Sequence, residues 1–273
     1  GEGLCLSQDG RVRYGGSKLR FRGPPKSLNG AFIACLGGTE TCGDNVAHPF
    51  PDLLEARFGL PCVNFGWPNA GVDVFVKDRG LLDCANRAVI CVLQVPGATN
   101  LGNMYYRVHP RRNDRLLGPT EALCSLFPEV DFTEFHFTRH LLCHLHDLCD
   151  RRFGYLRTEL AAAWQARMTT LLERIEVPVV LLWLSRRPLE DGQGAASLTP
   201  SLTAEPSLVS REMLQAIAPK AHALVVPGRP RATLHVIRGG AHAGPHGPPA
   251  TPDKLSRLLP DDRAHAAAAA ALG

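Results

Sequence analysis

The chain has 273 residues, of which 45% are hydrophobic and 21% are charged, and its formal net charge is +4. This composition excludes a wholly disordered chain and suits one large globular domain, with or without a small appendage. The charge is too small to indicate nucleic-acid binding, no segment has the length of a membrane span, and residues 1–10 lack the pattern of a secretion signal. We therefore expect a cytoplasmic protein with neither a nucleic acid nor a membrane as its partner.

The segment from residue 11 to residue 22 alternates basic and apolar residues around Gly15-Gly16, a pattern that predicts a basic hairpin. Its charges have two interpretations. They discourage aggregation through the sheet edge, which is the interpretation we favour, or they bind an anion. We expect residues 1–30 to form this hairpin and an extension, and residues 31–273 to form the main domain.

The rest of the chain alternates between apolar runs and helical periodicity. Five apolar runs predict strands: residues 31–36, 61–65, 88–95, 178–184 and 221–226. Helical periodicity marks four segments, the third long enough for two helices: residues 44–58, 72–86, 133–176 and 209–217. Such strands, buried on both faces and separated by helices, give a three-layer α/β/α sandwich with a mainly parallel sheet. Two segments rich in glycine, proline and other small residues are expected to be surface loops without core structure: residues 188–206 and 239–252.

The first apolar run continues into Gly37-Gly38-Thr39, where two glycines allow a tight turn from a strand into a helix. Parallel strands end at one edge of their sheet, so segments 64–71 and 97–103 and Ser185 should lie near this turn. A threonine hydroxyl is inert until a base takes its proton and donors stabilise the oxyanion that its attack creates. Thr39 is therefore the candidate nucleophile of a site at this edge.

Candidate partners for Thr39 lie far along the chain. Asp262 and His265 occur in an Asp-x-x-His pattern at the start of a predicted terminal helix, so both can face one site. His265 is the candidate general base, and Asp262 is the carboxylate that would orient it. His242 and His246 are alternative bases if their loop folds over the site. The candidate oxyanion donors are the N–H groups of Gly38, Glu40 and Gly71 and the side-chain amide of Asn100.

The order of these groups resembles that in the SGNH, or GDSL-like, hydrolases. That family has a nucleophile turn after its first strand, a glycine block after the second, a Gly-x-Asn-Asp block after the third and a terminal Asp-x-x-His. The corresponding segments here are Leu36-Gly37-Gly38-Thr39, Gly66 or Gly71, Gly97-Ala98-Thr99-Asn100 and Asp262-Arg263-Ala264-His265. The resemblance implies an SGNH or flavodoxin-like fold and an ester hydrolase or acyltransferase that acts on an acylated glycan or small molecule without a cofactor.

Three other segments resemble a bacterial family known only as a domain of unknown function. They are residues 37–41, 109–115 and 127–136. This second resemblance implies no particular activity.

The chain departs from the SGNH pattern in the first and third blocks. Thr39 stands where the family has serine, and its methyl group crowds the attack. Gly38 replaces the aspartate before the nucleophile, and Asn100 arrives one position late, after Thr99. Because a small displacement of a catalytic group can lower the rate by about a hundredfold, the alternative function is a noncatalytic SGNH-like module that binds an anionic or glycan ligand.

The segment 105–115, which follows the third strand, concentrates arginines beside two tyrosines. Arginine forks bind carboxylate, phosphate or sulfate through paired hydrogen bonds, and tyrosine rings can stack on a sugar. The competing interpretation is a solvated loop whose arginines pair with Asp114. The candidate ligand-binding residues are Arg107, Arg111 and Arg112, and they predict an anionic substrate.

His136, His140 and His144 repeat at helical spacing, which suits metal ligands, but the interleaved phenylalanine and leucine residues favour a helix-packing surface. We therefore expect no metal site. The nine cysteines show no metal-type pairing, and we expect reduced cysteines that are buried where they lie in apolar runs. The sequence specifies no oligomeric state.

Overall fold

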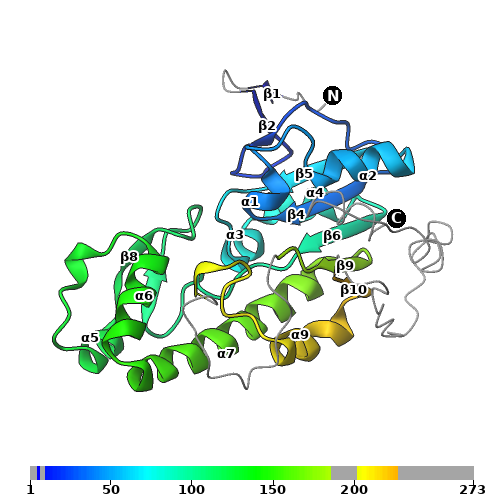
Figure 1. Cartoon of the computed structure of the whole chain (residues 1–273). Coiled ribbons are helices and arrows are strands. Elements are labelled where there is room, and N and C mark those ends of the chain that lie inside the picture. Colours follow the sequence, from blue (N-terminus) through cyan, green and yellow to red (C-terminus); the bar gives the residue numbers. More distant parts are fainter. Residues whose placement is uncertain (1–4, 7–9, 186–201, 227–273) are drawn as a thin grey trace.

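The computed structural model of the chain describes residues 5–6, 10–185 and 202–226 (Figure 1). Its centre is a five-stranded, all-parallel sheet in the order β10-β9-β6-β4-β5. The strands are β4 (Ile33–Gly37), β5 (Cys62–Gly66), β6 (Ile90–Gln94), β9 (Val179–Leu182) and β10 (Ala223–Val225). Every strand overlaps its predicted segment and extends at most one residue beyond it. The predicted α/β architecture with a mainly parallel sheet is therefore confirmed.

The order of the strands fixes where a ligand site is favoured. After β4 the chain forms β5 on one side and then returns to form β6 on the other side of β4. The connection that leaves the end of β4 therefore runs toward β5, whereas the connection that leaves the end of β6 runs the other way, toward β9. Open sheets of this type bind ligands beside such a reversal, at the carboxyl ends of the strands.

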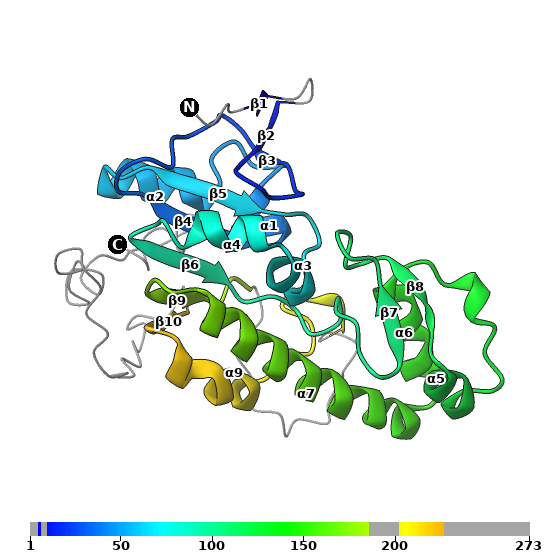
Figure 2. The same ribbon diagram turned by 180° about the vertical axis from the view of Figure 1, so that it is seen from behind.

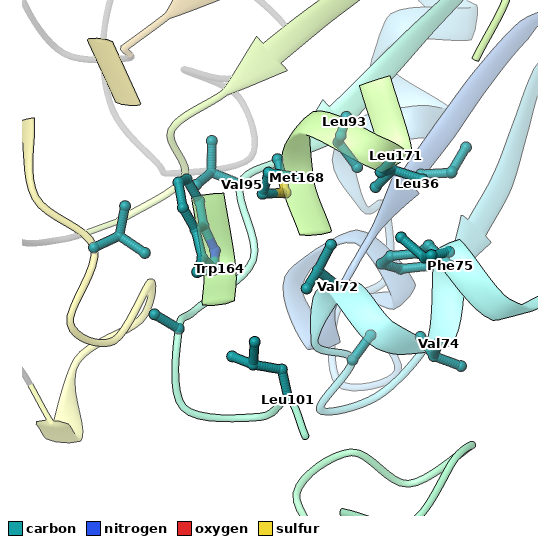
Figure 3. Close-up of a cluster of buried hydrophobic side chains, with 14 of the residues drawn as sticks. Leu36, Val72, Val74, Phe75, Leu93, Val95, Leu101, Trp164, Met168 and Leu171 are labelled. Atoms are coloured by element: carbon teal, nitrogen blue, oxygen red, sulfur yellow. The ribbon is translucent and has the colours of Figure 1, made fainter. Parts of the chain in front are cut away.

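Alternate residues of β4 point to the two faces of the sheet, and both faces are buried. On one face, Ile33 and Cys35 cluster with Phe50 of α2 (Phe50–Phe58). On the other face, Leu36 clusters with Phe75 of α3 (Val72–Lys77) and with α7 (Asp150–Arg174), as Figure 3 shows. The sheet thus has helices on both faces, as a parallel sheet requires.

Two of the predicted helices differ from the structure. The segment 44–58 is helical only from Phe50, because Pro49 takes the N-cap position with extended backbone. The segment 72–86 is divided at Asp78, whose carboxylate accepts the N–H of Leu81 and so begins α4 (Arg79–Ala85). The segment 133–176 does hold two helices, α6 (Thr138–Leu148) and α7, and the segment 209–217 holds α9 (Arg211–Ile217).

The N-terminal hairpin is confirmed, but it is not a freely solvated edge. Strands β1 (Cys5–Leu6), β2 (Arg11–Arg13) and β3 (Phe21–Arg22) pair in an antiparallel sheet. The connection between β2 and β3 spans residues 14–20 rather than the glycine pair alone, and Tyr14 within it is buried. The rings of Tyr14 and Phe21 lie 5.4 and 5.2 Å from the ring of Phe65 in β5, so the apolar side of the hairpin is part of the core.

A peripheral unit, of which the sequence predicted only one helix, lies beyond the carboxyl edge of the sheet (Figures 1 and 2). It contains an antiparallel ribbon, β7 (Tyr106–Val108) and β8 (Leu116–Pro119), together with α5 (Glu121–Leu126) and α6. The long helix α7 runs from this unit to the central sheet (Figure 2). Arg107 and Val108 lie in a strand where the sequence indicated only a loop.

The predicted surface loop 188–206 is wrong at its described end. Leu202 is buried in the main core, and the segment 202–209 returns to the carboxyl edge of the sheet, where Ser207 bonds to Thr99. The predicted loop 239–252 and the predicted helix 261–273 lie outside the described residues. Within the described ranges, no helix has the length and apolarity needed to cross a membrane.

Candidate functional site

Thr39 stands at the first position of a short helix, α1 (Thr39–Cys42), directly after β4 and the N-cap Gly38. The turn is tight because a side chain at Gly37 would overlap the hydroxyl of Thr41 and the side chain of Gln94. Only glycine fits at that point. The turn leaves Thr39 exposed at the carboxyl edge of the sheet, as the sequence predicted.

Gln94, the last residue of β6, fixes this turn from the neighbouring strand. Its side-chain oxygen accepts hydrogen bonds from the N–H of Gly38 at 3.0 Å and from both the N–H and the hydroxyl of Thr41 at 3.2 and 2.5 Å. Its side-chain nitrogen donates to Glu40 at 2.7 Å. One buried amide therefore holds residues on both sides of Thr39, namely Gly38, Glu40 and Thr41, a role that the sequence did not reveal.

The hydroxyl of Thr39 is bound by Asn69, which follows β5. The N–H of Asn69 donates to the Thr39 oxygen at 2.9 Å, and the hydroxyl in turn lies 3.4 Å from the Asn69 side-chain oxygen. Asn69 has a positive φ of 54°, a conformation that asparagine tolerates better than most residues. Its side-chain nitrogen also donates to Asp114 at 3.3 Å.

Two of the predicted oxyanion donors already have acceptors. The N–H of Gly38 donates to Gln94, and the N–H of Gly71 donates to the side chain of Asn113 at 3.1 Å. In this arrangement neither N–H group is free for an oxyanion, and a role of Gly38 and Gly71 as donors stays a prediction that would require these bonds to break. Glycine is needed at position 71 for another reason, because a side chain there would overlap the carbonyl oxygen of Asn100.

Asn100 and Glu40 remain as predicted donors at the site. The side-chain oxygen of Asn100 accepts the hydroxyl of Thr138 at 2.6 Å, and its side-chain nitrogen donates to the carbonyl of Asn69 at 3.2 Å. A side-chain amide nitrogen carries two hydrogens, so one further donation is possible. The N–H of Glu40 lies in the first turn of α1, where a helix cannot satisfy its own donors.

A pocket of about 390 Å³ opens above Thr39. Its walls come from the carboxyl ends of β4, β5 and β6, as predicted, and from the peripheral unit and the segment before α9. The lining residues most relevant to chemistry are Thr39, Glu40, Asn69, Asn100, Asp114 and Glu205. The predicted Ser185 lies beside this wall, where its hydroxyl donates to the carbonyl of Glu205.

Glu205 also lines this pocket, although no pattern in the sequence pointed to it. Burial raises the pKa of its carboxyl above the ordinary value, and the nearby charge of Glu40 acts in the same direction, although the N–H of Ser207 and Arg139 oppose it. The side chain of Arg139 lies 3.3 Å from it. The segment around Glu205 has neither helical nor strand periodicity, so only its position before the predicted helix at 209–217 could have drawn attention to it.

A second cavity, of about 850 Å³, adjoins the first and shares with it Asn69, Asp114 and Phe137. Basic side chains from two distant segments line it: Arg11, Arg13, Lys18, Arg20, Arg111, Arg112 and Arg115. The structure thus brings the N-terminal hairpin and the arginine-rich loop together. Arg107 is exposed on β7 and lines neither cavity, so its role as a ligand-binding residue stays a prediction.

The predicted base and its partner, His265 and Asp262, lie outside the described residues, as do His242 and His246. The histidines of α6 pack as expected: the rings of His140 and His144 lie 4.8 and 5.1 Å from the ring of Phe135. Within residues 5–6, 10–185 and 202–226, no group of histidine, cysteine and acidic side chains could hold a metal ion.

The cysteines in the apolar strands are buried and unpaired, which confirms that part of the prediction. Burial raises the pKa of the Cys91 thiol to about 12, and burial together with Cys62 raises that of Cys35. These thiols are core residues rather than nucleophiles.

Comparison with known proteins gives one match. A family model described as a domain of unknown function (DUF6473) matches residues 6–273, whereas no curated protein and no solved structure matches the chain. The predicted likeness to a family of unknown function is confirmed, and the likeness to the SGNH hydrolases stays a prediction. Because the match spans nearly the whole sequence, the chain belongs to the DUF6473 family.

Proposed function

We propose that this protein is an SGNH-like hydrolase or acyltransferase in which Thr39 attacks an acyl ester. The observation that carries the proposal is the position of Thr39, an exposed hydroxyl at the carboxyl end of β4, beside the reversal of strand order and in a pocket that Asn100 also lines. The volume of about 390 Å³ falls in the range of small-molecule sites, roughly 300–1,000 Å³. An acyl group with part of its alcohol would fill it.

In the proposed reaction, His265 takes the proton of Thr39 as the hydroxyl oxygen bonds to the ester carbonyl carbon, and Asp262 orients the imidazole. The tetrahedral oxyanion then collapses, the ester C–O bond breaks, and His265 returns the proton to the leaving alcohol. Water, or the hydroxyl of an acceptor, then attacks the acyl carbon and gives its proton to His265. The bond between that carbon and the Thr39 oxygen breaks, and His265 returns the proton to Thr39, which completes the cycle.

Asn100 and Glu40 would stabilise the oxyanion, since the N–H groups of Gly38 and Gly71 are bound elsewhere. The hydrogen bond from the N–H of Asn69 holds the Thr39 oxygen in a fixed position. The pocket wall carries three acidic side chains, Glu40, Asp114 and Glu205, and one basic side chain, Arg139, and this excess of acidic groups disfavours an acyl group with its own negative charge.

The test is turnover of short acyl esters by the full chain and by its Thr39 variants. We expect Thr39→Ala and His265→Ala to abolish turnover and Thr39→Ser to raise it, because serine lacks the methyl group that crowds the attack. Thr158→Ala, on the exposed side of α7, is the matched control and should retain wild-type turnover. Equal turnover by the wild type and Thr39→Ala would overturn the proposal.

The second candidate is a noncatalytic SGNH-like module that binds an anionic or glycan ligand. The observation that favours it is the pairing of the Gly38 and Gly71 N–H groups with Gln94 and Asn113, which leaves two positions of the expected oxyanion hole without a free donor. Absence of ester turnover, together with ligand binding that is lost on changing Arg111 and Arg112, would support this candidate. The expected cytoplasmic location also stays a prediction, which cell fractionation would test.

A further inference from the structure

The basic cavity is formed by two parts of the chain that the sequence separates by about a hundred residues. One wall is the outer side of the N-terminal hairpin and its turn, residues 11–20, and the other is the loop 111–115 between β7 and β8. Seven basic side chains and one acidic side chain, Asp114, line the cavity. Such a concave surface of one sign raises the local concentration of anions.

Most of these cations are not neutralised by the protein. Arg11 pairs with Asp44 at 2.5 Å, and Arg115 lies over the ring of Phe137. The other five have no acidic partner in the described part of the chain: Arg13, Lys18, Arg20, Arg111 and Arg112. Uncompensated like charges that face one cavity destabilise the fold, so their gathering is more readily explained by a ligand than by stability.

The loop wall of the cavity is held rigidly. The ring nitrogen Nδ1 of His109 accepts the N–H groups of Arg111 and Arg112 at 3.2 and 3.1 Å, and the indole N–H of Trp67 donates to the carbonyl of Arg111 at 2.5 Å. Buried Asn113 donates to the carbonyl of His109 at 3.0 Å. A fixed backbone lowers the entropy that is lost when arginine side chains close on a ligand.

The hairpin wall is fixed in a similar way. The carboxylate of Asp78 accepts the hydroxyl of Ser17 at 2.8 Å and the N–H of Lys18 at 3.0 Å. The hydroxyl of Tyr14 accepts the N–H of Lys26 at 3.0 Å, while its ring packs on Phe65. Both sets of cations are thus carried by backbone that the core already holds in place.

The size and position of the cavity favour a small ligand. About 850 Å³ lies within the range of small-molecule sites, roughly 300–1,000 Å³, and a net charge of +4 is low for a chain that tracks a nucleic-acid backbone. The cavity also shares Asn69, Asp114 and Phe137 with the pocket of Thr39. A ligand held among the arginines can therefore extend to Thr39.

We propose that the basic cavity binds a small molecule carrying at least two phosphate groups, gripped from one side by the hairpin and from the other by the arginine loop. That this molecule is also the substrate rests on the proposed function. Phosphate is the group that matches several arginine forks and lysines at once, because each phosphate presents several acceptor oxygens and up to two negative charges.

The test is calorimetric titration of the full chain with inorganic tripolyphosphate, with a hexose bisphosphate and with inorganic phosphate, at low and at physiological ionic strength. We expect the first two to bind at least tenfold more tightly than phosphate, with an affinity that falls as salt rises. Tighter binding of the hexose bisphosphate indicates a sugar phosphate as the natural ligand, and tighter binding of tripolyphosphate indicates free polyphosphate. Both results support the proposed chemistry.

The variants Arg13→Gln and Arg112→Gln test the two walls separately. Each should weaken binding of the same probe about tenfold, as expected for loss of one charge-assisted contact. Arg57→Gln, at the exposed end of α2 and outside both cavities, is the matched control for loss of one charge. Thermal melts should be unchanged for all three variants, because the substituted side chains are exposed.

Three results would overturn the inference. The first is that tripolyphosphate and the hexose bisphosphate bind no more tightly than inorganic phosphate. The second is that Arg57→Gln loses as much affinity for the probe as Arg13→Gln does. The third is that a single-stranded oligonucleotide binds more tightly through the same residues and displaces the probe. The outcomes remain distinguishable from those for Thr39, because binding does not require turnover. Ester turnover without polyphosphate binding removes this inference alone, and binding without turnover removes the proposed catalysis alone.

Discussion

The side-chain oxygen of Gln94 lies 2.5 Å from the hydroxyl oxygen of Thr41, which joins the end of β6 to the helix that carries Thr39. The same oxygen accepts the N–H groups of Gly38 and Thr41. The Thr39 turn is thus shaped by a neighbouring strand as well as by its own glycines. Its rigidity depends on one buried amide.

Gln94→Met should destabilise the protein by about 2–4 kcal/mol, because the volume is kept while buried donors lose their acceptor, each at a cost of about 1–3 kcal/mol. Urea unfolding at neutral pH would measure this change. Gln215→Met, on the exposed side of α9, is the control and should stay within about 0.5 kcal/mol of the wild type. Wild-type stability of Gln94→Met would show that the amide does not hold the turn.

Gly71→Ala should destabilise the protein by roughly 1–3 kcal/mol, because the added methyl would meet the backbone of Asn100 and push apart two walls of the Thr39 pocket. Gly154→Ala is the matched control in α7, where a methyl group meets no atom within 4 Å. There the same substitution should stabilise the helix by up to about 1 kcal/mol. Thermal unfolding of both variants would show whether Gly71→Ala lowers the stability while Gly154→Ala raises it. Equal changes in stability would contradict the predicted overlap at Gly71.

Asn113→Ala should weaken polyphosphate binding without any change of charge. The side-chain oxygen of Asn113 accepts the N–H groups of Gly71 and Val74, each at 3.1 Å, and its nitrogen donates to His109, so its loss frees the arginine loop from α3. We expect at least a threefold weaker Kd by calorimetry and faster amide exchange in residues 109–115. Asn29→Ala, on the exposed segment before β4, should change neither measurement.

The stability of the protein should fall in acid through Glu55. Burial alone would raise the pKa of this carboxyl, but hydrogen bonds from Lys26 Nζ at 2.6 Å and from the N–H of Cys62 at 2.7 Å lower it below the ordinary value. The ionised form therefore stabilises the fold above the unfolded pKa of about 4.3, and this contribution is lost as the pH falls through the lowered folded pKa.

Glu55→Gln should accordingly be less stable than the wild type by about 0.5–1 kcal/mol at neutral pH, and the difference should shrink as the pH approaches about 3. Urea titrations across this range provide the measurement. Asp52→Asn is the control, since its carboxylate lies 4.0 Å from Lys26 and should contribute little. If the stability difference between the wild type and Glu55→Gln grew as the pH fell, the predicted pH dependence would be wrong.

Thiol labelling should separate the cysteines by burial and charge. Iodoacetamide at slightly alkaline pH should modify exposed Cys124 and also Cys149, whose pKa is lowered by hydrogen bonds from the backbone and side chain of Arg152. Cys35 and Cys91 should react only after unfolding. Mass spectrometry of digested protein would locate the labels, and rapid labelling of native Cys91 would contradict its placement in the core.

The central sheet was predictable because its strands are short apolar runs, and burial on both faces leaves that signal in the sequence itself. The location of Thr39 and Asn100 on one pocket was predictable for a related reason, since parallel strands end at a common edge. The β7–β8 ribbon was not, because β7 has only three residues and lies in a segment rich in arginine, and β8 has no buried residue to mark an apolar face.

The residues that organise the site were hidden for a different reason. Gln94 and Asn113 act through hydrogen bonds to residues more than forty positions away, and a sequence pattern carries no information on such partners. Glu205 reaches the pocket through a segment without periodicity. The hairpin and the arginine loop each showed their charge in the sequence, but only the folded chain places them on the same cavity.

The adjoining cavities also differ in the sign of their charge. Glu40, Glu205 and a single arginine, Arg139, border the space above Thr39, whereas six arginines and Lys18 line the space beyond Asn69, Asp114 and Phe137. The balance of formal charge among the lining side chains therefore changes from acidic to basic where the two spaces meet. If a ligand with an anionic head and a neutral tail binds across both spaces, we expect its head to lie among the arginines and its tail toward Thr39, with no steric stop needed to set that direction.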